Sequence, residues 1–166
     1  LIDVTFTPDY GKVSTDRLNV LLYEFKADLN KYLASRGSIY KTLEDLIKFN
    51  DENKEKELKL FGQELFTQAQ AKADLNDKGY LDALAAVKRT SRDEGIDAVM
   101  AKDNLDAIVS PTSGATWAIA ATAGYPYITV PLGLREIPAT TNQAGAPVQA
   151  SIAATGMAFW GKAWSE

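Results

Sequence analysis

Apolar residues recur at helical spacing through the first part of the chain. Between positions 14 and 33 they fall at helical spacing, at Leu18, Leu21, Leu22, Phe25, Leu29 and Leu33. This spacing predicts an amphipathic helix that buries a single stripe. Ser14, Thr15 and Asp16 carry side chains suited to cap its first turn.

Further helices are predicted downstream by capping and periodicity. Thr42 followed by Asp45 resembles a capping box ahead of an apolar run that ends at Phe49. The mixed charges of residues 50–59 favour a solvated helix start or a connector. Two more helices are expected, one from Leu58 toward position 74 and one from about Tyr80 to a stop at Gly95. A short helical piece at 96–102 completes this part.

The pattern then changes to short apolar runs that end at prolines. Residues 105–110 stop at Pro111 and residues 127–130 stop at Pro131, as expected for buried strands. Between them, the alanine-rich stretch 116–123 predicts a short helix close to the sheet. The order of strand, helix and strand predicts a crossover that joins parallel strands.

The remaining residues favour a loop and more strands. Residues 135–147 contain two prolines and many small polar side chains, which is typical of an irregular loop. Residues 148–154 and 156–160 are candidates for one further strand each. The fold class predicted is α/β, with N-terminal helices packed on a small, mainly parallel or mixed sheet. Residues 1–102 form its mostly helical part and residues 103–166 its α/β part, within a single body.

Composition narrows the classes of function. The 166 residues are 46% hydrophobic, enough for one globular domain or one lobe of a larger one. There are 18 basic and 22 acidic residues, a net charge of −4, and no basic cluster, so we expect no binding of nucleic acid by this piece alone. No apolar run approaches the roughly 20 residues that cross a bilayer, so no membrane span is expected.

The chain contains no histidine and no cysteine. This excludes Ser-His-Asp and Cys-His mechanisms and nearly all zinc chemistry within these residues. No calcium-loop pattern occurs either. We therefore expect no metal and no cofactor.

The loop after the first predicted strand is the candidate site. Ligands of α/β proteins bind beyond the carboxyl ends of parallel strands, and here that position holds Thr112 and Ser113. The alternative is turn chemistry, in which Pro111 stops the strand and the hydroxyl groups cap the next helix. Trp117, Trp160 and Trp164 offer either a stacking surface or, as we favour, core side chains.

Other patterns favour structural roles. Ser38 and Lys41 match S-x-x-K, a spacing that on a helix brings a hydroxyl near an activating amine, but capping explains them adequately. The acidic residues at 93–94, 103 and 106 fit helix ends and turns better than a pair of glycosidase carboxylates. Gly156 and Gly161 belong to no phosphate-binding pattern and are expected to permit close packing or a bulge.

Two segments carry a resemblance to a known family. Residues 105–133, LDAIVSPTSGATWAIAATAGYPYITVPLG, and residues 156–166, GMAFWGKAWSE, resemble the C-terminal part of the amidase signature family. That family hydrolyses carboxylic amides with a Ser, cis-Ser, Lys triad whose serines lie in a stretch rich in Gly and Ser. No such stretch occurs here, since the only Ser-Gly dipeptide is at 113–114. The resemblance thus implies a C-terminal fragment that carries no catalytic residue.

The resemblance also implies a role and a setting. Thr112, Ser113 and Trp117 would lie on the rim of the acyl or leaving-group pocket. The partners implied are the N-terminal catalytic portion of the same polypeptide and a small amide substrate. A cytoplasmic location is favoured, and association into a homo-oligomer through sheet edges stays open. The alternatives are the A subunit of a glutamyl-tRNA amidotransferase and a non-catalytic interaction or binding module that shares the fold.

Overall fold

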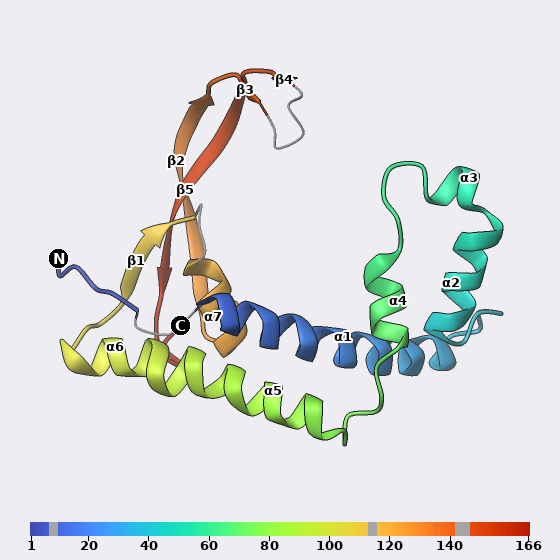
Figure 1. The fold of residues 1–166 in the computed structure, drawn as a ribbon. Helices are drawn as coiled ribbons and strands as arrows, with labels where there is room; N and C mark the ends of the chain where they lie inside the picture. The colour runs from blue at the N-terminus through green and yellow to red at the C-terminus, as the bar shows by residue number, and fades with distance from the viewer. Residues whose placement is uncertain (7–9, 113–115, 142–146) are drawn as a thin grey trace. The chain divides into compact units, whose positions relative to one another are not determined.

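The computed structural model describes residues 1–6, 10–112, 116–141 and 147–166 (Figure 1). The chain divides into two compact units, Asp9–Val87 and a second unit made of Leu1–Pro8 and Lys88–Glu166. Residues 88–102, which the sequence pattern groups with the helices, thus belong to the unit that holds the sheet. Within the described ranges, none of the helices is both long and apolar enough to cross a membrane.

The helical unit is built on one long helix. Its elements are α1 (Tyr10–Ser35), α2 (Leu43–Glu52), α3 (Lys54–Glu57), α4 (Glu64–Gln70) and α5 (Lys78–Lys88). The prediction that α1 begins near Ser14 is wrong, because the helix already starts at Tyr10 and the predicted caps lie inside it. The charged segment 50–59 forms the end of α2 and the short α3, as expected for a solvated connector.

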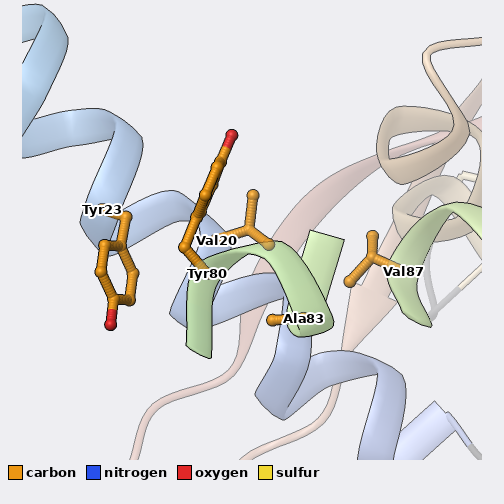
Figure 2. Close-up of a cluster of buried hydrophobic side chains, with 5 residues drawn as sticks. All are labelled: Val20, Tyr23, Tyr80, Ala83 and Val87. Atoms are coloured by element: carbon orange, nitrogen blue, oxygen red, sulfur yellow. The ribbon is translucent and has the colours of Figure 1, made fainter. Parts of the chain in front are cut away.

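Two apolar clusters hold this unit together, and both include α1. Val20 and Tyr23 pack against α5, in the cluster that Figure 2 shows with Tyr80, Ala83 and Val87. On another side of α1, Leu22 packs with Leu43 and Ala69, supported by Phe25, Leu29, Ile47 and Phe66. The predicted stripe is therefore only partly right, since Leu18 and Leu21 are exposed. Helix α1 buries two faces because it has neighbours on both.

Capping fixes the start of α2 as the sequence predicts. The Thr42 hydroxyl accepts from the Asp45 amide at 3.2 Å, and the Asp45 carboxylate accepts from the Thr42 amide at 2.9 Å. The Lys41 amide also donates to this carboxylate, at 2.8 Å. These donors, with Lys41 contributing most, lower the pKa of Asp45 because they stabilise its charged form. The capping box is confirmed.

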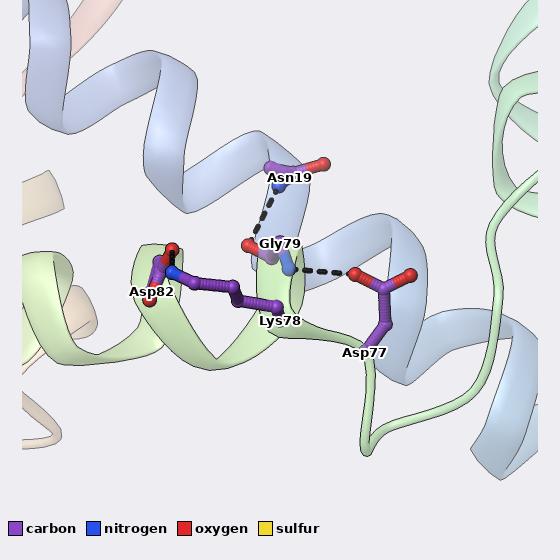
Figure 3. Close-up of polar contacts among 5 residues, drawn as sticks. All are labelled: Asn19, Asp77, Lys78, Gly79 and Asp82. Carbon is purple, nitrogen blue, oxygen red and sulfur yellow. Dashed lines mark hydrogen bonds and ion pairs between the residues drawn. The ribbon is translucent and has the colours of Figure 1, made fainter.

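Polar contacts tie α5 to α1 (Figure 3). The Asn19 side-chain amide donates to the Gly79 carbonyl at 3.4 Å, and the Gly79 amide donates to the Asp77 carboxylate at 2.6 Å. Lys78 and Asp82 form an ion pair one helical turn apart. Asp77 therefore caps the start of α5, and Asn19 joins this end of α5 to α1.

The second unit joins helices to a three-stranded sheet. Its helices are η1 (Arg89–Ile96), α6 (Asp97–Lys102) and α7 (Thr116–Ala123), and its sheet contains β1 (Ile108–Pro111), β2 (Tyr127–Ile137) and β5 (Ser151–Trp160). A small second sheet pairs β3 (Thr140–Thr141) with β4 (Pro147–Val148). The helical path breaks at Gly95, whose backbone is non-helical, so the predicted stop is confirmed there. The predicted helix at 116–123 coincides with α7.

The α/β class is confirmed, but the predicted parallel pairing is wrong. The strand order is β1-β5-β2, and β5 pairs antiparallel with both neighbours. Strands β1 and β2 do share a direction, as the crossover predicts, but β5 lies between them. The two predicted strands at 148–154 and 156–160 are in fact largely one strand, β5. The predicted loop at 135–147 contains the end of β2 together with β3 and β4, and residues 142–146 lie outside the described part.

Two helices in this unit end in the same way. After α7, Gly124 takes a left-handed φ of 69°, and the Tyr125 amide donates back to the Ala120 carbonyl at 3.0 Å. After α6, Asn104 has a φ of 49°, and the Leu105 amide donates to the Met100 carbonyl at 2.9 Å. Both are Schellman-type ends, in which Gly or Asn allows the chain to turn sharply into a strand.

Candidate functional site

Thr112 links the end of β1 to the middle of β5. Its amide donates to the Gly156 carbonyl at 3.0 Å, and its hydroxyl is within 3.1 Å of both the carbonyl and the amide of Gly156. The hydroxyl can thus donate to one backbone group and accept from the other, and its side chain is half-buried. This arrangement favours the structural alternative for Thr112, because the backbone of β5 already engages its hydrogen-bonding groups.

Gly156 is required by the closeness of this contact. A Cβ at this position would lie 2.9 Å from the Val130 carbonyl oxygen and 3.1 Å from the methyl groups of Thr112 and Thr129. The expectation that Gly156 permits close packing is confirmed. The sequence marked Gly156 as a position of close packing. It could not identify Thr112 as the residue that Gly156 contacts across the sheet.

The other two predicted rim residues follow Thr112 in the chain. Ser113 lies outside the described residues. Trp117 stands in the first turn of α7 and is 48% exposed. Thr112 and Trp117 therefore bracket the segment that leads from β1 into α7, which is where the sequence places the rim.

The three tryptophans differ in their environments. Trp160 is buried in β5, its indole N–H donates to the Ser110 hydroxyl at 3.2 Å, and its ring stacks on Phe6 at 5.4 Å between centroids. The core prediction is confirmed for Trp160. It is wrong for Trp117 and for Trp164, which is 92% exposed. A tryptophan with apolar neighbours in the sequence is therefore buried only where another part of the fold packs against its side chain.

A polar cluster fixes the far end of α7. The Arg92 Nε donates to the Ala123 carbonyl at 2.8 Å, and the guanidinium lies over the Tyr125 ring at 5.6 Å. The Tyr125 hydroxyl donates to the Asp97 carboxylate at 2.8 Å. A cation at a helix C-terminus is favourable, and so is a cation over an aromatic face. The cluster therefore holds α7 against η1 and α6.

The surroundings of Tyr125 favour the neutral form of its hydroxyl. Burial is the main cause that raises the pKa of its hydroxyl, followed by the hydrogen bond to Asp97 and the charge of that carboxylate, while Arg92 acts in the opposite direction. A neutral tyrosine can donate to Asp97, whereas a phenolate would be repelled. Tyr125 is therefore suited to a positioning role, and its sequence context gave no sign of these partners.

A hollow lies at the opposite end of the sheet from Thr112. Its volume is about 370 Å³, and it is lined by Asp106, Ala107, Pro126, Tyr127, Ile128, Phe159, Trp160, Gly161, Ser165 and Glu166. Cross-strand pairing places Ile108, Trp160 and Tyr127 in one row at this end. The hollow and the predicted rim thus occupy different ends of β1, and the structure does not combine them into one site.

The remaining candidate motifs have local roles. Ser38 accepts from the Tyr40 amide at 3.0 Å, and the Lys41 ammonium donates to the Arg36 carbonyl at 2.9 Å. Both residues precede α2, so they do not face each other along a helix as S-x-x-K chemistry requires. Among the described residues, no group of acidic side chains is placed to hold a metal ion.

The architecture of this chain is similar to that of proteins with solved structures. The chain matches the crystal structure of native peptide amidase from Stenotrophomonas maltophilia with a TM-score of 0.79 and 38% identity, over 95% of the chain. The chain is homologous to the C-terminal part of amidase signature proteins. A structure of peptide amidase with the competitive inhibitor chymostatin matches equally well, with a TM-score of 0.80 over 96% of the chain. No family model matches.

A curated relative agrees with this amidase assignment. One relative is a protein from Schizosaccharomyces pombe that is named as an amidase. It is 28% identical to this chain over an alignment of 145 residues that covers 76% of the chain. The chain spans 25% of that relative and 32% of peptide amidase. The amidase resemblance of residues 105–133 and 156–166 is thereby confirmed. The described residues of these segments include β1, α7, the first part of β2 and the last part of β5.

Proposed function

We propose that this chain is the C-terminal part of an amidase-type hydrolase that cleaves the C–N bond of carboxylic amides. The observation that supports this most strongly is the similarity to peptide amidase, at 38% identity over 95% of the chain. Because the match covers only 32% of that enzyme, the proposal assigns the chemical step to residues outside these 166. The chain itself completes the sheet and supplies part of the pocket wall.

The proposed substrate is an amide with peptide-like groups beside it. Peptide amidase, as its name states, acts on peptides, and it binds the competitive inhibitor chymostatin. In this proposal Thr112, Ser113 and Trp117 border the pocket. The hydrogen bonds from Thr112 to Gly156 would keep that border rigid, which supports a positioning role for Thr112 and leaves direct contact with substrate to Ser113 and Trp117.

Isolated, the chain should be inactive. It has no histidine or cysteine and no stretch rich in Gly and Ser that could supply the family's two serines. Ser38 and Lys41 are engaged in backbone contacts near α2. An oxyanion donor contributes roughly 3 kcal/mol to transition-state stabilisation. We assign no oxyanion donor to this chain.

The test measures ammonia release from a C-terminal peptide amide and from glutamine. We compare the 166-residue chain with a fusion in which the uncovered part of Stenotrophomonas maltophilia peptide amidase precedes it. Turnover of the peptide amide by the fusion alone supports the proposal. Turnover by the isolated chain would contradict it, as would a folded but inactive fusion. Preference for glutamine would favour the amidotransferase alternative.

A further inference from the structure

The two faces of the sheet differ sharply in burial. Directly paired residues of antiparallel strands point to the same face, so Ile108 and Trp160 share one face, with Ala158 two positions along β5. All three side chains are buried, and Phe6 stacks on Trp160. This face is already covered within the chain.

The opposite face carries apolar side chains that the described residues of this unit leave partly exposed. One row consists of Val109, Phe159 and Ile128, which are paired across β1, β5 and β2 and are 39%, 40% and 64% exposed. The next row along the strands consists of Pro111, Met157 and Val130. Val130 is 39% exposed, Pro111 is exposed and Met157 is half-buried. We refer to these two rows as the open sheet face.

The open sheet face has the character of an interior surface. It contains no charged residue, although an antiparallel sheet that faces water normally alternates apolar and polar positions. Contiguous apolar patches on soluble proteins generally mark a surface that packs against another layer. At its edge, Ile128 and Phe159 also line the hollow described above, so the apolar surface extends beyond the two rows.

We propose that the open sheet face is the docking surface for the N-terminal part of the amidase, which covers it with an apolar layer. This inference rests on the proposed function. It is supported by the lengths of the relatives, since the matched segment is 32% of peptide amidase and about two thirds of that chain lies outside it. Domains bury each sheet face against a second layer. Because the two rows carry no charge, we expect the layer that covers them to be apolar.

Single cysteines test the proposal cleanly, because the chain has none of its own. Ile128→Cys and Phe159→Cys probe the open sheet face. Ala158→Cys probes the buried face of the same strand, and Lys48→Cys, on an exposed side chain of α2, is the solvent control. Each is treated with a maleimide in the isolated chain and in the fusion with the uncovered part of peptide amidase, and the modified peptide is located by mass mapping.

The expected result is a change confined to the open sheet face. Cysteines at 128 and 159 react as fast as the one at 48 in the isolated chain, and at least about tenfold more slowly in the fusion, since modification then requires local opening. The cysteine at 158 reacts slowly in both. Equal rates at 128 and 48 in the fusion would overturn the proposal, as would a fusion that does not fold and a co-expressed N-terminal part that never co-purifies.

Two further readouts separate the possible failures. Protection at 128 that rises with the concentration of the isolated chain, together with a dimer in light scattering, would overturn the proposal in favour of a second copy of the chain. Ammonia release is measured on the same fusion. Protection without turnover would keep the docking surface and reject the proposed function, whereas turnover with a fully reactive cysteine at 128 would reject only the docking surface.

Discussion

At the scale of single residues, the contact between Thr112 and Gly156 is the tightest constraint on the candidate rim. The hydroxyl and amide of Thr112 bond to the backbone of Gly156, and no Cβ fits at that glycine without displacing the Val130 carbonyl or nearby methyl groups. The position of the loop after β1 therefore depends on two residues that are far apart in the sequence. Gly156 can be changed without altering a side chain that borders the proposed pocket.

Gly156→Ala should destabilise the protein by about 1–3 kcal/mol, because overpacking forces the surrounding backbone to move. The measurement is urea unfolding followed by circular dichroism. Gly37→Ala is the matched control, since a Cβ there meets nothing within 4 Å and should leave stability unchanged or slightly raised. Equal midpoints for the two variants would mean that β2 and β5 are less closely packed at Gly156 than described.

Tyr125 makes stability sensitive to alkaline pH. Because its pKa in the folded protein is raised above the ordinary value of 10.0, the unfolded chain releases this proton at a lower pH than the native state does. The stabilising contribution is complete below pH 10 and is lost as pH rises through the raised pKa.

Urea midpoints measured between about pH 8 and 11 should therefore fall more steeply for the wild type than for Tyr125→Phe. The phenylalanine variant keeps the ring under Arg92 but has no proton to lose. Parallel curves for the two proteins would show that folding does not raise the pKa of Tyr125.

At the scale of elements, local signals predicted well and pairing across the sheet did not. Helix α7 has the predicted bounds, and the capping box at Thr42 forms as expected, because both depend on residues within one or two helical turns. The antiparallel arrangement depends on β5, which is last in the chain and takes the central position. No spacing between β1 and β2 could indicate that a later strand would separate them.

Thr42→Ala should lower the stability of the helical unit by about 1 kcal/mol, because the Asp45 amide loses its acceptor at the start of α2. Thr42→Ser retains the hydroxyl and should behave nearly as the wild type. Thermal unfolding followed at the helical circular dichroism signal measures both variants. A Ser variant as weak as the Ala variant would attribute the effect to the methyl group instead.

The candidate site was predictable only in part. The sequence located the segment between β1 and α7 through the proline that ends the strand and the small residues that follow. It gave no sign that the Thr112 side chain is engaged with β5, or that Arg92, Asp97 and Tyr125 meet at the end of α7. These contacts join residues from separate elements, and a single sequence records the residue types without their partners.

At the scale of the whole molecule, the low net charge and the open sheet face together favour association between copies of the chain. The sequence has a pI of about 4.9 and a net charge of −4 at pH 7, so repulsion between copies vanishes near pH 5. Light scattering should therefore be greatest near pH 5 and fall as the pH is raised to about 8. Scattering that does not vary with pH would show that apolar contact alone controls association.

The strands β2 and β5 continue beyond the part of the sheet that includes β1. Strand β1 pairs only with residues 157–160 of β5, whereas β2 accompanies β5 as far as the pair of Ile137 and Ser151. A two-stranded ribbon lacks the support of a third strand, so its amide protons should exchange with solvent faster than those at 157–160. The sheet would thus open progressively from its two-stranded end. Its slowest-exchanging amides would lie in the three-stranded part at residues 157–160, next to the contact between Gly156 and Thr112.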